Sequence, residues 1–490
     1  MLACAAACST AVSSLPARAA APDLAAIDAY VNGERAAQHM PGLALGLVHG
    51  DLIVHVAGFG AADESGRPVT GDTPFFLGST TKSFTALAIM QLIEAHRLAL
   101  DARVRDVIPW FRVADEAASA AITVRDLVYQ TSGLSTRAGR LTLTEYSTGA
   151  DALENRVRRL ASIAPTAPVG SRFQYSNANY QVLGLIVQQI AGEPYEGYVE
   201  QHIFAPLAMT HSFTAKAPAA AAGLALGHRM IFGRPTGFDE PFPRGSVSQG
   251  FLISSASDLT HYLIAQLNDG RYGDASVLSA DGIAQLHRGV AAGDGNGGAR
   301  YAMGWVDDRH FDRRAVWHDG DTFGYHSFIA LLPDDGWGVV VLANANDIAA
   351  SLRFEAIAWG VLGRAIGRVE PPAHVHDAAI AHGILVGILL LQLLGVARTA
   401  AVLRRWRRSP DSRPALSMRI ARIGLPFAVG VVWALLVLVG IPRSFGPLDV
   451  ATMAVPDLAW LLIASAVFAG VWAFVRVGLA ARALRASAAL

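Results

Sequence analysis

Lysine, cysteine and net charge are all scarce in this chain of 490 residues. Lys82 and Lys216 are its only lysines, so arginine supplies the rest of the positive charge. Cys4 and Cys8 are the only cysteines, which excludes a disulfide or a cysteine metal site from the chain beyond its first ten residues. Forty Lys and Arg balance forty Asp and Glu. We therefore expect no nucleic-acid partner.

Apolar residues, in contrast, are abundant: they make up 52% of the chain, and the mean hydropathy is +0.34. The last third holds much of this excess, in three apolar stretches that are long enough, or nearly so, to cross about 30 Å of hydrocarbon. They lie at about 378–397, 423–441 and 458–475. We predict a membrane domain over 378–490 whose three transmembrane helices contact lipid, preceded by a linker at 370–377.

The charges around these stretches predict an orientation. Between the first and second stretch, Asp411 is the one acidic residue among eight arginines. These are Arg398, Arg404, Arg405, Arg407, Arg408, Arg413, Arg419 and Arg422. Because cytoplasmic loops are enriched in Lys and Arg, this loop and the C-terminus are expected in the cytoplasm.

Residues before the first stretch are then expected outside the cytoplasm. The alanine-rich segment 1–21 resembles the later part of a secretory signal, although it lacks the positively charged opening. We predict a multi-pass protein of the cell (inner) membrane, with residues 22–369 as an extracytoplasmic (periplasmic) domain.

The domain at 22–369 has strand character at both ends and helical character between them. Apolar runs typical of strands lie at 43–49, 52–59, 315–317, 327–332 and 338–343. Residues 101–290 are mainly helical in pattern. This order predicts one sheet built from both ends of the domain, with an inserted all-helical lobe. A cleft between two such lobes is a common place for an active site.

The stretch Phe75-Phe-Leu-Gly-Ser-Thr-Thr-Lys82 joins an apolar run to a helical pattern. Ser79 falls at the start of this helix, and Lys82 follows one turn later on the same face. A hydroxyl becomes a good nucleophile when a neighbouring base takes its proton, and a partly buried lysine can do so. A serine that merely caps the helix, with an unrelated lysine, is the alternative.

Two further short patterns carry polar side chains. Tyr175 and Asn177 lie at a loop-to-helix junction, where the phenol can relay protons and the carboxamide can hold a substrate amide or the lysine. His318, Gly320 and Asp321 follow a short strand. The glycine lets a substrate backbone approach, and His318 can meet a substrate carboxylate. Ordinary helix-capping and sheet-edge roles are the alternatives.

Taken in order, Ser79-x-x-Lys82, Tyr175-x-Asn177 and His318-x-Gly320 resemble the motifs of the serine β-lactamase and penicillin-binding-protein superfamily. The likeness is greatest to its class C and esterase-like branch, in which His-x-Gly often replaces Lys-Thr-Gly. Supporting stretches are Leu127-Val-Tyr-Gln-Thr-Ser-Gly-Leu134, Ser257-Asp-Leu259 and Tyr301-Ala-Met-Gly-Trp305. The resemblance covers about residues 23–367. It implies an α/β (α+β) fold in which helices flank an antiparallel sheet.

The resemblance also implies roles for these residues. Ser79 would form an acyl-enzyme, Lys82 would assist its deprotonation, and Tyr175 would shuttle the proton. Asn177, His318 and Gly320 would bind substrate, and the N–H groups of Ser79 and Asp321 would bind the oxyanion. No metal or cofactor is implied. The missing Lys-Thr-Gly, and a carboxyl group at Asp321, are departures from the family pattern that weaken the case for binding an anionic substrate group.

We therefore expect a membrane-anchored serine hydrolase acting on an ester, an amide or a D-amino-acid peptide, either a small molecule or a component of the cell envelope. A β-lactamase and a D-Ala-D-Ala carboxypeptidase or transpeptidase are the alternatives within enzymes. A penicillin-binding sensor and an envelope scaffold are alternatives of another class. The intact Ser/Lys/Tyr set disfavours a scaffold, and the short cytoplasmic loops disfavour a self-contained sensor.

Overall fold

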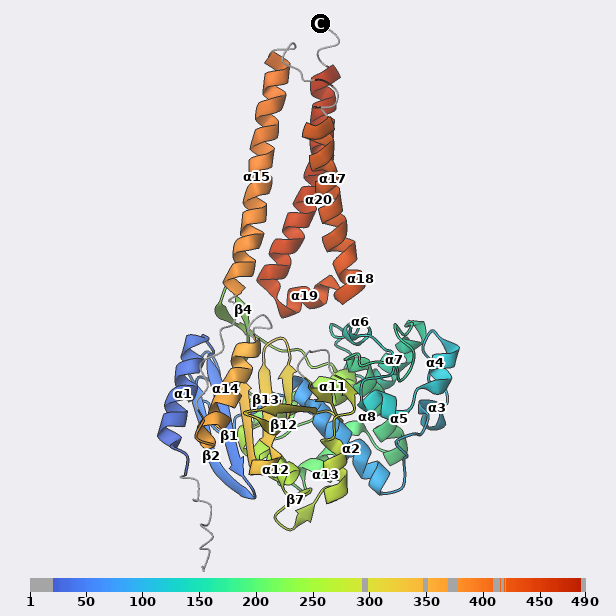
Figure 1. Ribbon diagram of the computed structural model, residues 1–490, viewed down its shortest axis with the longest axis vertical. Coiled ribbons are helices and arrows are strands. Elements are labelled where there is room, and N and C mark those ends of the chain that lie inside the picture. Colours follow the sequence, from blue (N-terminus) through green and yellow to red (C-terminus); the bar gives the residue numbers. More distant parts are fainter. Residues whose placement is uncertain are drawn as a thin grey trace, which may run out of the picture.

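The computed structural model describes residues 21–292, 298–346, 351–368, 378–408 and 420–485, together with residues 415 and 418. Residues 21–368 form a rounded unit, here called the sheet domain, and long C-terminal helices extend away from it (Figure 1). Residues 1–20 of the predicted signal-like segment, and the predicted linker at 370–377, lie outside the described residues.

The centre of the sheet domain is an eight-stranded antiparallel sheet. Its strands, in spatial order, are β2 (Leu52–Gly60), β1 (Gly42–His49), β14 (Trp337–Ala343), β13 (His326–Leu332), β12 (Arg313–Asp321), β11 (Val306–His310), β10 (Arg300–Tyr301) and β9 (Ala291–Ala292). β1 pairs with β14, so the two ends of the domain meet in the middle of the sheet, as predicted. Gly50, with a φ of +59°, makes the expected turn between β1 and β2.

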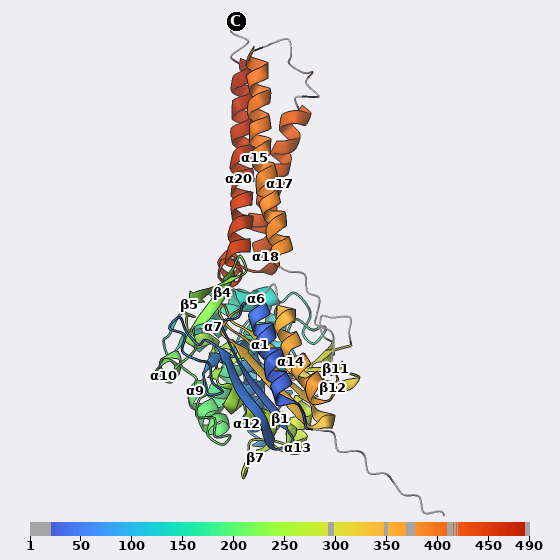
Figure 2. The ribbon, with the colours of Figure 1, turned by 90° about the vertical axis from the view of Figure 1, so that its left-hand side faces the viewer.

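Helices cover both faces of this sheet, which explains why its central strands are continuous apolar runs. On one face, α1 (Leu24–Ala37) and α14 (Ser351–Ala365) pack against Phe328 and Ala330 of β13 (Figure 2). The alternate residues Ile329 and Leu331 belong to the larger core on the other face, which includes α2 (Thr81–Glu94) and α12 (Ala256–Leu267).

A helical lobe is inserted between the strands, as the sequence predicted. Its main helix, α8 (Asn177–Ala191), packs against α2. The other helices of this region are α3 (Val104–Val107), α4 (Glu116–Ala121), α5 (Val124–Val128), α6 (Thr136–Arg140), α7 (Ala152–Arg159), α9 (Tyr195–Val199), α10 (Lys216–Ala221), α11 (Val247–Gly250) and α13 (Ala280–Leu286). The three small two-stranded sheets are β3 (Phe75–Phe76) with β6 (Ile253–Ser254), β4 (Gly227–Ile231) with β5 (Arg234–Phe238), and β7 (Arg271–Tyr272) with β8 (Ala275–Ser276).

Three segments of the C-terminal part are helical, and long and apolar enough to cross a membrane: Ile380–Trp406, Ala421–Phe445 and Pro456–Ala483. They contain α15 (Ala378–Arg408), then α17 (Leu425–Leu435) and α18 (Ile441–Phe445), and finally α20 (Pro456–Arg485). The short helix α19 (Leu448–Ala454) joins α18 to α20.

The first of these helices is longer than predicted. α15 continues to Arg408 rather than ending near residue 397, so Arg398, Arg404 and Arg405 lie on the helix and not in a loop. Arginine and alanine are good helix formers, and nothing requires a helix to end where its apolar stretch ends.

Two π-helical turns interrupt the second segment. They are η8 (Ile420–Gly424) and η9 (Leu436–Gly440), and each ends two residues before a proline, Pro426 or Pro442. Proline lacks the N–H that would donate to the carbonyl four residues earlier, which favours a local change of helical pitch.

Candidate active site

Ser79 lies between β3 and α2, where the chain passes close to β12. It belongs to a short 3₁₀ turn, η1 (Gly78–Thr80), and α2 begins two residues later. Gly78 has a φ of +52°, and a Cβ there would lie 2.5 Å from the Asp321 nitrogen. A Cβ on Gly320 would lie 2.0 Å from the Leu77 carbonyl oxygen and 2.9 Å from the Ser79 nitrogen. Glycine at both positions thus allows the Ser79 turn and the end of β12 to come together.

Lys82 is bound to Ser79, as the helical spacing predicted. Its Nζ donates to Ser79 Oγ at 2.8 Å and to the Gln249 carbonyl oxygen at 2.7 Å, and the lysine side chain is fully buried. Burial lowers the Lys82 pKa to about 7, although the nearby Asp319 carboxylate raises it slightly. The lysine therefore exchanges its proton near neutral pH, which a general base needs.

Tyr175 lines the same cavity as Ser79. The Lys82 Nζ is 4.9 Å from the centre of its ring. Burial raises the pKa of Tyr175 well above its usual value, and its interaction with the Ser79 hydroxyl lowers that pKa only partly. The phenol is therefore protonated at neutral pH, so it can donate a proton before it accepts one.

Asn177 is the first residue of α8 and lines the cavity above Ser79. Its Oδ1 is buried, and among the described residues it has no hydrogen-bond partner. A buried acceptor without a partner costs free energy, which a substrate N–H can recover. Among the hydrogen bonds of the described residues, Lys82 Nζ donates to Ser79 and Gln249 rather than to this carboxamide.

The three residues on β12 occupy different places. Gly320 and the Asp321 backbone lie beside Ser79. The Asp321 carboxylate lines the cavity, and one of its oxygens lies 2.8 Å from His326 Nδ1. Burial lowers the pKa of His326, but the nearby carboxylates, Asp321 first among them, together raise it above its usual value. His326 therefore partly balances the charge of Asp321.

His318 is buried behind the cavity and is not among its lining residues. Its Nδ1 is 2.6 Å from the Asp319 carbonyl oxygen, and its Nε2 is 3.3 Å from the Tyr301 hydroxyl. Burial lowers the pKa of His318 against the opposing effect of Asp319. The imidazole of His318 is therefore neutral, and it packs beside the rings of Tyr175 and Tyr301.

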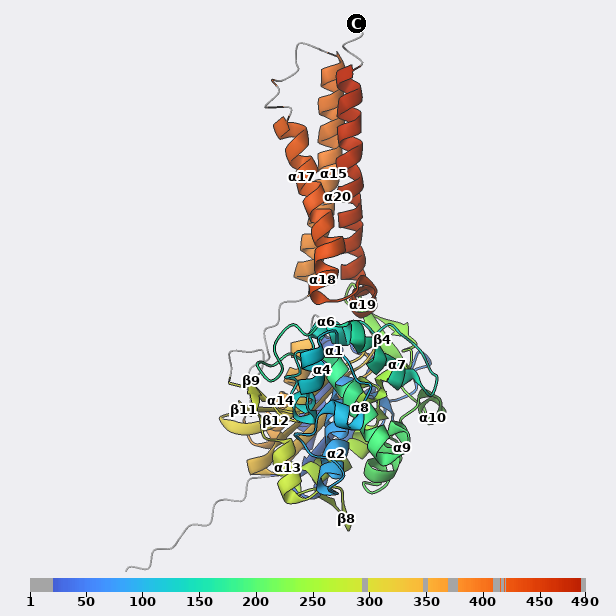
Figure 3. The ribbon, with the colours of Figure 1, turned by 90° about the vertical axis from the view of Figure 1, so that its right-hand side faces the viewer.

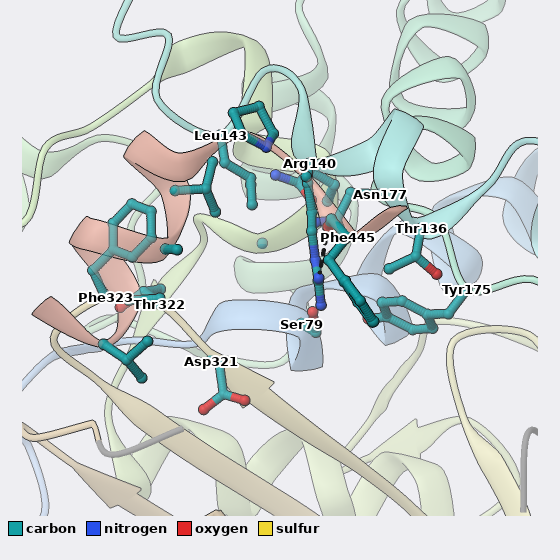
Figure 4. A pocket seen from close by; sticks show the side chains of 18 of the residues that line it. Ser79, Thr136, Arg140, Leu143, Tyr175, Asn177, Asp321, Thr322, Phe323 and Phe445 are labelled. Atoms are coloured by element: carbon teal, nitrogen blue, oxygen red, sulfur yellow. Dashed lines mark hydrogen bonds between the residues drawn. The ribbon is translucent and has the colours of Figure 1, made fainter. Parts of the chain in front are cut away.

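The cavity has a volume of about 380 Å³ and contains side chains that the sequence motifs did not indicate (Figure 4). Arg140 extends toward Ser79 from the end of α6. The buried Glu240 accepts hydrogen bonds from the Gly324 N–H at 2.7 Å and from the Thr322 hydroxyl at 3.1 Å. Burial raises its pKa to about 7 in spite of these bonds. Neither residue is part of a recurring short pattern, and only the fold brings them to the serine.

Within the described residues, no group of three or more His, Cys, Asp or Glu is placed to hold a metal ion. The polar groups in and beside the cavity include a serine with its buried amine partner, a phenol, a carboxamide and an arginine. This set is suited to nucleophilic attack on a carbonyl carbon followed by proton transfer to a leaving group.

Ser79 and Lys82 are thus hydrogen-bonded to each other at the edge of this cavity. A sequence model of the Beta-lactamase family matches residues 27–362. The chain belongs to this family of serine hydrolase-like proteins.

Relatives fall among penicillin-binding proteins and related chains. Penicillin-binding protein 4 of Amycolatopsis lactamdurans is 31% identical over 349 residues, which are 68% of this chain and 88% of that protein. Protein flp of Staphylococcus aureus (strain MW2) is 28% identical over 330 residues, or 65% of this chain. The match spans only 63% of the length of Protein flp.

Solved structures share the fold of the sheet domain. An octameric penicillin-binding protein homologue from Pyrococcus abyssi has a TM-score of 0.61 at 26% identity, covering 74% of this chain and 81% of its own. A class C beta-lactamase has a TM-score of 0.60 at 19% identity, covering 72% of this chain and 98% of its own. The predicted fold and superfamily are thereby confirmed.

Proposed function

We propose that this protein is a membrane-anchored serine hydrolase that acts outside the cytoplasm through an acyl-enzyme on Ser79. One observation carries the proposal: the Lys82 amine is buried, has a pKa near 7, and lies 2.8 Å from Ser79 Oγ. Burying an amine is costly, and here the buried amine points at a hydroxyl on the wall of a cavity.

The proposed reaction uses these groups in order. Neutral Lys82 accepts the Ser79 proton while Oγ attacks the substrate carbonyl carbon. The N–H groups of Ser79 and Asp321 stabilise the oxyanion. Tyr175 then donates a proton to the leaving alcohol or amine and regains one from Lys82. A water molecule hydrolyses the resulting ester by the same steps in reverse, which regenerates Ser79.

The substrate is an ester, an amide or a D-amino-acid peptide. The unpartnered Asn177 Oδ1 favours a substrate with an N–H near the reacting carbonyl. Arg140 favours a D-Ala-D-Ala peptide or a β-lactam as the second candidate, because a guanidinium in the cavity can pair with a carboxylate where Lys-Thr-Gly is missing.

The extracytoplasmic location is supported by the ends of the C-terminal helices. Arg404 and Arg405 lie near the end of α15, and Arg482 lies near the end of α20. Both ends are far from the sheet domain (Figure 1). If the arginine-rich ends face the cytoplasm, the sheet domain and Ser79 lie on the opposite side of the membrane.

Labelling of the full chain with a fluorescent fluorophosphonate tests the nucleophile. We expect a mass-spectrometric adduct on Ser79 and complete loss of labelling in Ser79→Ala. Hydrolysis of nitrocefin, short aryl esters and D-Ala-D-Ala peptides by the same preparation then separates the substrate classes. Labelling that persists in Ser79→Ala rules out the assignment.

A reporter fusion tests the orientation. An enzyme active only in the cytoplasm, fused after Leu490, is expected to be active. If a periplasmic reporter works at that position instead, the sheet domain is cytoplasmic.

A further inference from the structure

One wall of the Ser79 cavity comes from the C-terminal helices. The segment that connects the second and third apolar helices, here called the α18–α19 segment (residues 441–455), lies against the sheet domain near α6 and β4 (Figure 3). Some of its side chains line the same cavity as Ser79 and Tyr175. The larger apolar ones are Ile441, Phe445, Val450, Ala454 and Val455.

Hydrogen bonds hold the α18–α19 segment in this place. Arg137 Nε donates to the Pro442 carbonyl oxygen at 3.1 Å, and Arg140 Nη1 donates to the Phe445 carbonyl oxygen at 2.9 Å. The Thr144 hydroxyl donates to the Asp449 carboxylate at 2.6 Å. The cavity wall is therefore attached to the same helix, α6, that carries Arg140 to the serine.

A second attachment lies at the start of α20. The Phe232 N–H, in the turn of the β4–β5 hairpin, donates to Asp457 Oδ2 at 2.6 Å. The same carboxylate oxygen is 2.7 Å from His382 Nε2 of α15. The α18–α19 segment is thus bound to the sheet domain on both sides, so its contribution to the cavity is a fixed part of the structure.

The two walls differ in chemistry. Ser79, Asn177 and Arg140 offer hydrogen bonds and charge, whereas those side chains of the α18–α19 segment that line the cavity offer only hydrocarbon and one aromatic ring. A polar substrate group against that wall would lose water without gaining a partner. An aliphatic group would gain, by about fourfold in affinity for each methylene that it buries.

The location of the apolar wall is equally informative. α18 ends one candidate membrane span and α20 begins the next. The α18–α19 segment therefore lies where the hydrocarbon of the membrane gives way to water, on the side of the sheet domain. An aliphatic chain anchored in the membrane has a short route from there to the cavity.

We propose that the natural substrate is an amphiphile, an ester or amide whose carbonyl reacts at Ser79 while its aliphatic chain lies against the α18–α19 segment. This inference rests on the proposed function and adds the substrate class to it. The segment is then a specificity element supplied by the membrane part of the chain, in addition to being a connection between anchors.

The test uses the full chain in lipid nanodiscs and p-nitrophenyl esters with acyl chains of increasing length, from acetyl to octanoyl. In Val450→Trp the indole occupies the space against the wall. We expect kcat/KM for the octanoyl ester to fall by about tenfold relative to the unmutated chain, with a loss that shrinks as the acyl chain shortens. Because each ester is compared between two proteins, its partition into the lipid cancels.

Val450→Asn, which nearly keeps the volume but adds an amide, is expected to give a loss with the same dependence on chain length. Ile53→Trp is the matched control: Ile53 lies on β2, outside the cavity and 45% exposed, so every ester should be hydrolysed as before. Fluorophosphonate labelling of Ser79 checks that each variant is folded.

The outcomes separate the two proposals. If Val450→Trp still labels on Ser79 but its hydrolysis changes equally at all chain lengths, or not at all, the amphiphile proposal is overturned and the serine hydrolase stands. An unmutated chain that neither hydrolyses any ester nor labels on Ser79 overturns the proposed function itself.

Discussion

The central strands of the sheet domain and the C-terminal helices are both apolar runs, yet they expose their side chains in opposite ways. Ile329 and Val341, in the central strands, are fully buried, whereas Leu391 and Leu394 on α15 are 68% and 64% exposed. The hydrocarbon of a membrane would cover such a surface favourably.

One lysine of the sheet domain and two arginines of α15 show the same contrast between burial and exposure. The sheet domain buries Lys82 completely beside Ser79, whereas Arg404 and Arg405 of α15 are exposed at its far end. A cation in water needs no explanation, but a buried amine does. This contrast is one reason why we propose Lys82 as the general base and the arginines as determinants of orientation.

The largest effect is expected from removing the buried amine. Lys82→Gln should lower kcat/KM by about 10² to 10⁴-fold, the usual contribution of a general base. In the unmutated chain, activity should rise with pH around 7, because Lys82 is protonated below its pKa and able to accept the Ser79 proton above it. Measuring kcat/KM from pH 5.5 to 9 for an aryl ester (values chosen to bracket about 7) checks both expectations.

The other lysine provides the control. Lys216 is paired with the exposed Asp239 at 2.6 Å and also lowers the pKa of the cavity residue Glu240, so Lys216→Gln should keep a rise in activity near pH 7 and should not cause the large loss of kcat/KM expected for Lys82→Gln. If the rise near pH 7 persists in Lys82→Gln, another group is the base.

A smaller effect, on stability, compares the two kinds of apolar residue directly. Ile329→Ala removes buried contacts in the larger core and should lower the free energy of unfolding of the sheet domain by about 2–5 kcal/mol. Leu391→Ala removes an exposed side chain and should change it by less than about 0.5 kcal/mol. Denaturant unfolding of the full chain in nanodiscs, followed by loss of Ser79 labelling, measures both. Equal effects would mean that the C-terminal helices also support the sheet domain through packing.

The smallest effect is expected at the junction between the two regions. Thr144→Val removes the hydrogen bond to Asp449 and should weaken the attachment of α19 by about 1 kcal/mol. Faster amide hydrogen exchange in Leu448–Ala454 would report it.

Thr166→Val removes a comparable exposed contact, between Thr166 and Gln174 within the sheet domain, and should leave exchange in α19 unaltered. If hydrogen exchange in α19 is unaltered in both variants, the remaining hydrogen bonds from Arg137 and Arg140 are sufficient to hold the α18–α19 segment in place.

Features that depend on residues close in sequence could be predicted. The spacing of Ser79 and Lys82 is a single helical turn, the β1–β2 hairpin turns at Gly50, and three apolar stretches of membrane length become three helices. In each case a short pattern determines the local conformation, because periodicity and turn chemistry act over a few residues.

Other features depend on residues far apart, and these only the tertiary structure decided. Lys82 is held by the Gln249 carbonyl, 167 residues away, and Arg140 meets Phe445, 305 residues away. Such contacts leave no local pattern, because they depend on how complete elements pack.

The α18–α19 segment shows the same division. Its apolar residues were visible in the sequence only as part of a connection between membrane helices. Packing against α6 and the β4–β5 hairpin made them a wall of the Ser79 cavity. The sequence by itself determined the pairing of Ser79 with Lys82 and the three long apolar helices, because these are local; the shape of the cavity was decided by long-range packing.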